Sequence, residues 1–282
     1  MKRIAMQTDK TEIKAAIIDL YEDYPNQGMR SFQDLLKQYR IQYGINLTYQ
    51  IFDLRGKNEI PDLSFDLYIS SGGPGSPLDS EGSEWERLYW NLIDGIEAHN
   101  QSDAQQKKHV LFVCHSFQLM CRRLKLGDVN KRNSESFGIF PTHPTEAGLS
   151  EPLFEDLADP FFIVDSREWQ VINPDEDRFK EIGAKLLAIE KERLHVPFPR
   201  AMMAIRFNEY FFGTQFHPEA DPEGMKVRMF SEDKKKVIID EYGQEKYDDM
   251  LNSLNDPDKI VLTHKTIIPN FLYQALQSLQ EA

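Results

Sequence analysis

Cysteine is nearly absent from this chain, with only two in 282 residues. Cys114 and Cys121 lie close together across a predicted turn and helix, which is a poor arrangement for a disulfide. Two thiols are also too few for a metal site built from thiolates. The low count therefore excludes a disulfide scaffold and a thiolate metal centre, and we interpret both cysteines as free thiols.

Long hydrophobic runs are missing too. No stretch of about 18 consecutive apolar residues occurs, and residues 1–7 carry charge without the apolar core of a signal peptide. Basic residues are also scarce relative to acidic ones, with 33 Lys and Arg against 46 Asp and Glu and a net charge of −13. Such a surface repels nucleic acid and anionic membranes, so we expect neither as a partner. These features predict a soluble, cytoplasmic protein.

The first half of the chain alternates between apolar segments of strand length and amphipathic segments of helix length. This alternation is typical of an α/β fold with a mostly parallel central sheet flanked by helices, whose ligand sites lie at the carboxyl ends of the strands. The predicted strands are residues 12–20, 47–51, 65–70 and 110–113, and the predicted helices are residues 29–39, 84–98 and 117–126.

Beyond residue 127 the pattern changes to short strand-like pieces, which indicate hairpins and a small antiparallel sheet. The main domain is predicted to span residues 1–220, followed by an appended helical segment, 221–282, whose last helix packs on the core. Within this part the predicted strands are residues 137–140, 161–165, 168–172, 202–207 and 210–216, and a charged amphipathic helix is predicted over 175–194.

The stretch of residues 108–120 is a buried strand that runs directly into a helix, and Cys114 lies at the turn between them. Four consecutive apolar residues, 110–113, precede the cysteine, and helical spacing resumes after it. At a helix N-terminus the unpaired N–H groups and the helix dipole favour a thiolate, the form of sulfur that attacks carbonyl groups.

Two other pieces of the sequence can supply what a cysteine nucleophile needs. A base must hold the thiolate, a carboxylate must orient the base, and fixed backbone donors must stabilise an oxyanion. His217 and Glu219, which follow a late predicted strand, can act as the base and the carboxylate. The glycine-rich loop at residues 71–75 and the N–H of His115 can supply the backbone donors, because glycine lets a backbone N–H approach a substrate closely.

These pieces together resemble the class I glutamine amidotransferases, whose motifs are GxCxGxQ and HPE. Here they read FVCHSFQ at residues 112–118 and HPE at 217–219, with SGGPG at 71–75. The resemblance covers about residues 12–220. Within the family, the chain is similar to the stand-alone glutaminase subunit of GMP synthase. It implies that Cys114 is the nucleophile, His217 the base and Glu219 its orienting carboxylate. It further implies Gly72, Gly73 and His115 at the oxyanion site, and Gln118 near the glutamine pocket.

The reaction implied by the resemblance is hydrolysis of a glutamine side-chain amide to glutamate and ammonia through a thioester, with no metal or other cofactor. The chain departs from the family motif at Phe112 and Ser116, which stand where the family has glycine. No synthetase domain is visible in the sequence. Three alternatives stay open: a glutaminase that works with a separate synthetase subunit, a free-standing γ-glutamyl hydrolase, and a non-catalytic binding or regulatory protein that retains the fold.

Overall fold

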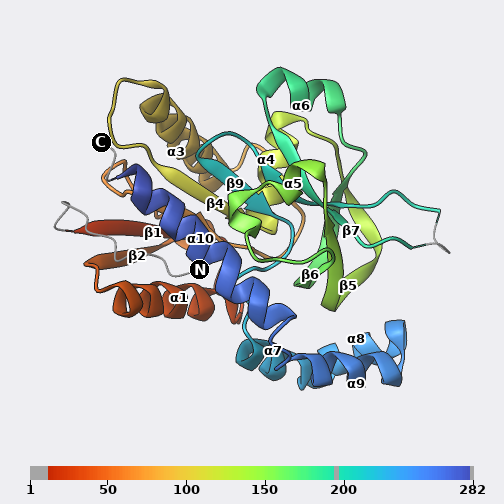
Figure 1. The fold of residues 1–282 in the computed structure, drawn as a ribbon. Helices are drawn as coiled ribbons and strands as arrows, with labels where there is room; N and C mark the ends of the chain where they lie inside the picture. The colour runs from red at the N-terminus through yellow and green to blue at the C-terminus, as the bar shows by residue number, and fades with distance from the viewer. Residues whose placement is uncertain (1–11, 194–196, 280–282) are drawn as a thin grey trace.

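The computed structural model of this protein describes residues 12–193 and 197–279 (Figure 1). Within these residues, nine strands form a single sheet in the order β2-β1-β3-β4-β9-β8-β7-β5-β6. The strands that run parallel are β1 (Ile13–Asp19), β2 (Leu47–Asp53), β3 (Leu67–Ser70), β4 (His109–Val113) and β9 (Phe211–Thr214). The antiparallel part contains β8 (Met202–Arg206), β7 (Lys185–Glu190), β5 (Asp128–Pro144) and β6 (Phe161–Ile172).

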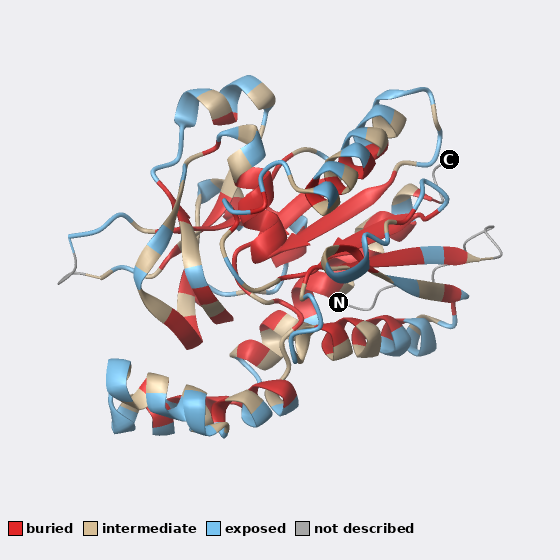
Figure 2. Ribbon diagram, turned by 180° about the vertical axis from the view of Figure 1, so that it is seen from behind, coloured by how far each residue is buried: buried red, intermediate tan, exposed pale blue. Residues whose placement is uncertain are grey.

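The parallel strands form the centre of the molecule because both of their faces are buried. Alternate residues of β4 enter different cores: Leu111 packs in the core on one face of the sheet and Phe112 in the core on the other. Helices α1 (Gly28–Tyr43) and α10 (Ile260–Ser278) cover the first face, whereas α3 (Glu84–Gln101) and α4 (His115–Leu124) cover the second. Figure 2 shows these central strands buried along most of their length.

The predicted α/β fold with a mostly parallel sheet is confirmed. The antiparallel strands, however, continue the same sheet, because β8 pairs with β9 at the end of the parallel part. The pieces predicted separately at 161–165 and 168–172 are one strand, β6, and residues 137–140 form the middle of the longer β5. The irregular register between these two strands near Lys131 and Ser136 accounts for the break in the sequence pattern.

The helix predicted over residues 175–194 is wrong. The structure instead has a short helix, α6 (Glu176–Ile182), followed by β7. Gly183 ends the helix with a φ of +73°, a left-handed conformation that glycine adopts without steric cost. Leu187, which lies within the predicted helix, is fully buried inside the sheet. Residue 194 lies outside the described residues.

The chain after residue 220 forms four helices, all within the described residues: α7 (Pro222–Met229), α8 (Glu232–Tyr242), α9 (Gln244–Ser253) and α10. Figure 1 shows α8 and α9 projecting beside the antiparallel strands, while α10 returns across the sheet. Ile267, Ile268 and Phe271 of α10 are fully buried in the same core as α1. The remaining helical pieces are α2 (Leu54–Lys57), α5 (Glu146–Leu149) and the 3-10 turn η1 (Pro152–Phe154).

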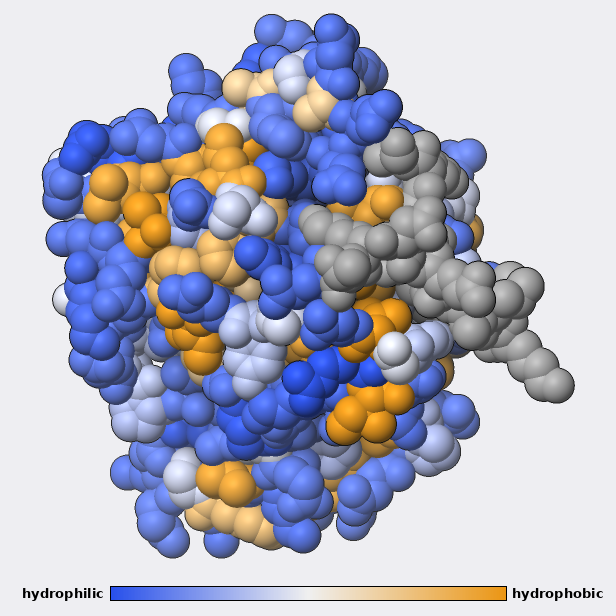
Figure 3. All heavy atoms as spheres, turned by 90° about the vertical axis from the view of Figure 1, so that its left-hand side faces the viewer, coloured by the Kyte–Doolittle hydropathy of each residue, from blue (hydrophilic) through white to orange (hydrophobic). Residues whose placement is uncertain are grey.

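The surface agrees with the charged composition. On the face opposite the antiparallel strands, hydrophilic side chains dominate and hydrophobic residues form scattered patches (Figure 3). Among the described helices, none combines the length and the apolar character that crossing a membrane requires.

Candidate active site

Cys114 occupies a strained turn between β4 and α4. Its φ of +52° and ψ of −98° lie in a region that non-glycine residues rarely adopt. Hydrogen bonds hold the turn: the Cys114 N–H donates to the carbonyl of Thr214 at 2.7 Å, and the Val113 N–H donates to Oγ of Ser116 at 2.8 Å. This geometry matches a nucleophile elbow, in which a sharp strand-to-helix turn exposes the reactive side chain at the sheet edge.

The two departures from the family motif are accommodated by packing. Phe112 is fully buried on the far face of the sheet, where its ring contacts the rings of Phe207 and Phe211 at centroid distances of 5.7 Å each. Its partner across the ladder is Gly213, and a Cβ there would lie 3.3 Å from the Cβ of Phe112 and 2.8 Å from the ring of Phe207. The space for the phenylalanine is therefore provided by a glycine on the neighbouring strand.

Ser116 stabilises the elbow directly. Its hydroxyl accepts the hydrogen bond from Val113 and can donate to the carbonyl of Ser70 at 2.9 Å, which lies at the end of β3. A glycine at this position would make neither bond, so the serine ties the cysteine turn to the strand that precedes the glycine-rich loop.

His217 and Glu219 form a buried pair in the turn that follows β9. The backbone N–H of His217 donates to the carbonyl of Val164 at 2.9 Å, and its Nδ1 donates to Oε1 of Glu219 at 2.7 Å. Glu219 is 1% exposed. Burial alone would lower the pKa of His217, but the negative charges of Glu219 and Cys114 outweigh this effect and raise the pKa well above its ordinary value. The histidine therefore favours the imidazolium form beside the cysteine.

Gly72 lies against both Cys114 and His217. A Cβ at this position would be 3.0 Å from Cε1 of His217, which is tight, and 3.4 Å from the Cβ of Cys114, which is an ordinary contact, so a side chain here would press on His217. At Gly73 a Cβ would lie 2.3 Å from the carbonyl oxygen of Leu20, a contact that no side chain can tolerate. The loop thus approaches Leu20 and His217 as closely as only glycine permits.

His115 and Gln118 lie on the first turns of α4. The N–H of His115, as the first residue of the helix, has no intrahelical acceptor and directly follows Cys114. Its side chain is buried, and burial together with the nearby charge of Arg55 lowers its pKa to about 3, so the imidazole is neutral. Gln118 donates from Nε2 to the carbonyl of Trp169 at 3.1 Å and to Oε1 of Gln215 at 3.2 Å.

A cleft of about 280 Å³ opens over this arrangement. Gly72 and His115 lie beside the cleft rather than on its surface. Five of the residues predicted from sequence line it, namely Gly73, Cys114, Gln118, His217 and Glu219. The structure therefore brings together, at the carboxyl ends of the strands, residues that are up to 146 positions apart in the sequence, from Gly73 to Glu219.

Several lining or neighbouring residues were missed by the sequence analysis. Tyr21 follows β1, and burial together with the negative charges of Glu219 and Cys114 raises its pKa well above the ordinary value, so its hydroxyl remains protonated. Gln215 Nε2 lies 3.8 Å from the sulfur of Cys114. Tyr21 could have been found, because it follows the carboxyl end of a predicted strand. Gln215 could also have been found, because it lies two residues before the histidine of the HPE motif.

Helix α7 supplies one wall of the cleft, with lining residues that include Met225 and Arg228. The side chain of Asp221 accepts a hydrogen bond from the N–H of Gly224 at 2.7 Å, capping the helix, and pairs with Arg30 of α1 at 2.6 Å. The predicted main domain ended at residue 220, so α7 was not predicted to be part of the site.

Comparisons with known proteins agree with the fold, and the matched family range includes α7. A family model described as glutamine amidotransferase class-I matches residues 28–237. No curated protein sequence matches the chain.

Three solved structures illustrate the likeness. A glutamine amidotransferase from Thermotoga maritima has a TM-score of 0.65 at 15% identity, covering 94% of this chain and 99% of its own. A glutamine amidotransferase from Methylobacillus flagellatus has a TM-score of 0.61 at 14% identity, covering 96% of each chain. The glutaminase domain of Trypanosoma brucei CTPS, with bound acivicin, has a TM-score of 0.53 at 13% identity, covering 74% of this chain and 86% of its own. At these identities the likeness establishes the fold alone.

Proposed function

This chain belongs to the class I glutamine amidotransferase family, and we propose that it hydrolyses the side-chain amide of glutamine or of a γ-glutamyl compound through a thioester on Cys114. One arrangement carries the proposal. Cys114 is held at a φ of +52° beside His217, whose Nδ1 lies 2.7 Å from the buried carboxylate of Glu219. A cysteine beside a charged histidine that a carboxylate orients supplies three of the groups that thiol-based amide cleavage needs, and backbone donors for the oxyanion are the fourth.

In the first half of the proposed reaction, the thiolate of Cys114 attacks the carbonyl carbon of the side-chain amide. The backbone N–H groups of Gly73 and His115 stabilise the oxyanion that forms. The imidazolium of His217 donates its proton to the amide nitrogen, the carbon–nitrogen bond breaks, and ammonia or an amine leaves. A thioester on Cys114 remains.

In the second half, His217 accepts a proton from a water molecule, which attacks the thioester carbonyl. The carbon–sulfur bond breaks, the thiolate beside the protonated histidine is restored, and the product leaves as a carboxylic acid that gives its proton to the solvent. Glu219 keeps Nδ1 of His217 as the hydrogen-bond donor throughout, so that the other ring nitrogen faces the reacting groups. No step in this scheme calls for a metal or another cofactor.

The fate of the ammonia divides the proposal into two candidates. The Trypanosoma brucei relative is a glutaminase domain, which supports a separate synthetase subunit as a partner for this chain. The cleft, however, also extends from Cys114 to Met225 and Arg228 of α7. Space along this wall for a substituent on the amide nitrogen supports the second candidate, a γ-glutamyl hydrolase.

The test is release of ammonia or amine by the purified chain from glutamine and from a panel of γ-glutamyl amides, with Cys114→Ser as the control. Faster turnover of the substituted amides would identify a hydrolase. No turnover together with fast labelling of Cys114 by a glutamine-like electrophile would indicate a missing synthetase subunit. Absence of both turnover and labelling would overturn the proposal in favour of a non-catalytic protein.

The role of the histidine is tested by the same labelling reaction. We expect His217→Ala to slow alkylation of Cys114 near neutral pH, because the variant removes the cation that faces the thiolate. Labelling at the wild-type rate in this variant would contradict the assignment of His217 as the base.

A further inference from the structure

A second cavity of about 550 Å³ lies on the other side of β5 and β6 from the Cys114 cleft. Strand alternation separates the two: Phe137 and Val164 line the cleft, whereas their neighbours Ser136 and Ile163 line the second cavity. The two cavities share no lining residue. The catalytic scheme therefore makes no use of this space.

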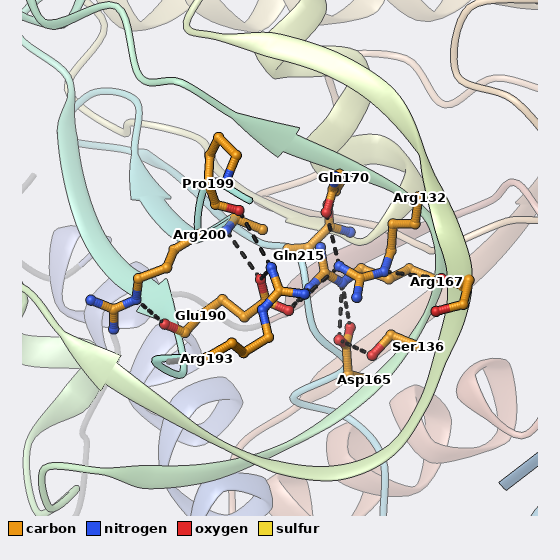
Figure 4. Close-up of polar contacts among 12 residues, drawn as sticks. Arg132, Ser136, Asp165, Arg167, Gln170, Glu190, Arg193, Pro199, Arg200 and Gln215 are labelled. Carbon is orange, nitrogen blue, oxygen red and sulfur yellow. Dashed lines mark hydrogen bonds and ion pairs between the residues drawn. The ribbon is translucent and has the colours of Figure 1, made fainter. Parts of the chain in front are cut away.

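Arginine side chains from three parts of the chain converge on the carboxylate of Glu190, which lines this cavity; of the three, Arg167 lines the Cys114 cleft and not the second cavity. Arg132 of β5, Arg167 of β6 and Arg193 after β7 all pair with the carboxylate of Glu190, at 3.4, 3.1 and 3.1 Å respectively (Figure 4). Arg132 and Arg193 line the cavity, as does Lys191, whose ammonium makes no ion pair with any residue that the structure describes. One carboxylate thus serves three guanidinium groups in a protein whose net charge is −13.

The acceptors present do not satisfy these donors. Arg167 donates from Nε to both oxygens of Asp165 at 2.9 Å and from Nη2 to Glu190, yet its Nη1 is buried without a partner among the described residues. The buried Nε of Arg193 also has no partner within that part of the chain. Unpaired buried donors are costly. Of these two, the Nε of Arg193 is the one that belongs to a residue lining the second cavity, because Arg167 lines the Cys114 cleft.

The acid–base behaviour of the cluster agrees with an excess of positive charge. Burial, and then the neighbouring guanidinium of Arg167, lower the pKa of Arg132. Burial, and then the charge of Lys246, lower the pKa of Lys191. Each cation is therefore held at a cost that an additional anion in the cavity would reduce.

The cavity also has an apolar part, beside polar side chains that include the carboxylates of Asp165 and Glu241. Phe140, Ile163, Met203 and Tyr242 line it, and Nζ of Lys191 lies 4.3 Å above the ring centroid of Phe140. A hydrated inorganic ion would leave these side chains without contact. An organic ligand with an apolar body and an anionic group would contact both parts of the surface.

We propose that this second cavity binds a small organic anion, whose carboxylate or phosphate group pairs with Arg132, Arg193 and Lys191 while its apolar body packs against Phe140. Guanidinium groups bind both kinds of oxyanion through paired, charge-assisted hydrogen bonds. A network that served stability alone would balance its charges, whereas this one supplies more donors than the described residues accept.

The experiment is calorimetric titration of the full chain with phenyl phosphate and with benzoate at constant ionic strength. We expect saturable binding of one molecule with a Kd below about 1 mM for at least one of the two probes. The tighter probe identifies the preferred anionic group. If neither probe binds at a concentration of about 10 mM, ten times the expected upper limit of the Kd, the proposal is overturned.

Variants locate the binding. Arg132→Gln and Arg193→Gln are each expected to weaken it at least about tenfold, because each removes a charge-assisted hydrogen bond. If an arginine variant unfolds, Lys191→Gln replaces it as the test variant, because this substitution breaks no ion pair with the described residues. The matched control is Arg87→Gln, an exposed arginine of α3 paired with Glu84, which should leave the Kd unchanged. Equal affinity in all these variants would show that the probe binds elsewhere.

Discussion

At the scale of single residues, the short distances between the glycine loop and its neighbours decide which residue types fit in the site. A side chain at Gly72 would press on His217, and one at Gly73 would press on the backbone of Leu20, just after β1. His217 and Glu219 depend on each other in a different way, because the carboxylate is what keeps a buried histidine charged. Two substitutions test these two kinds of dependence.

Gly73→Ala should lower kcat for amide hydrolysis by about 10²- to 10³-fold, the usual loss when an oxyanion donor is displaced. The added Cβ would lie 2.3 Å from the carbonyl oxygen of Leu20, so the loop must move. Steady-state ammonia release measures the change. Gly95→Ala is the control, because a Cβ there meets only Leu63 side-chain atoms at 3.7 Å. Wild-type kcat in the Gly73 variant would rule out its N–H as a donor.

Glu219→Gln should lower the pKa of His217. In the wild type this pKa lies above the unfolded value of about 6.5, so the charged histidine stabilises the fold below that pH, and the contribution is lost as the pH rises through the folded pKa. In the variant, burial prevails over the remaining charge of Cys114. An NMR titration of the His217 ring measures the shift.

Glu209→Gln is the control for this titration, because Glu209 is an exposed residue of the β8–β9 turn. It should leave the pKa of His217 unchanged. An identical titration curve for the Glu219 variant would contradict the assignment of Glu219 as the charge partner.

At the scale of elements, β4, α4 and β9 form one unit around the elbow. The strained Cys114 is held by a hydrogen bond from its backbone N–H to a carbonyl of β9. Phe112 is buried against the glycine that β9 places opposite it. Ser116 connects the same turn to β3. The stability of the elbow is therefore shared among three strands and not stored in the turn itself.

Phe112→Ala should cost about 3–5 kcal/mol of unfolding free energy, because it leaves a cavity between the rings of Phe207 and Phe211. Urea denaturation measures the loss. Phe230→Ala, at a position 53% exposed, should change stability by about 0.5 kcal/mol or less. A loss below about 1 kcal/mol for Phe112→Ala would mean that its neighbours close the space or that the ring contributes little packing.

At the scale of the whole molecule, the C-terminal helices differ in their attachment. Helices α8 and α9 expose most of their residues, as Figure 2 shows, whereas α10 shares a core with α1 and the parallel strands. Helix α7 lies between these extremes, anchored by the Arg30–Asp221 pair and facing the cleft. The part of the chain after residue 220 therefore contributes to both the core and the candidate site.

Removal of α10 by ending the chain at residue 259 should abolish cooperative unfolding, because it exposes the apolar core that Ile267, Ile268 and Phe271 cover. Circular dichroism with size-exclusion chromatography measures the effect. The milder variant Phe271→Ala should still fold and lose about 3–5 kcal/mol. A truncated chain that unfolds cooperatively at the wild-type midpoint would show that α10 is dispensable.

The sequence by itself determined four of the five parallel strands, β1 to β4, and the positions of the proposed catalytic groups, whereas β9 was predicted as an arm of an antiparallel hairpin. Four apolar residues before Cys114 require burial on both faces of a strand, and the HPE and glycine-loop motifs are local patterns. It could not separate α6 from β7, because charged residues with helical spacing continue past Gly183 and only pairing with β8 and β5 makes the second part a strand.

Tertiary structure alone decided how distant residues meet. The space for Phe112 comes from Gly213, which lies 101 positions later, and the cluster around Glu190 joins side chains from β5, β6 and the loop after β7. The α7 wall of the cleft was equally invisible in the sequence. Residue periodicity records which face of an element is buried, whereas the identity of the partner across that face depends on long-range strand pairing, which periodicity does not encode.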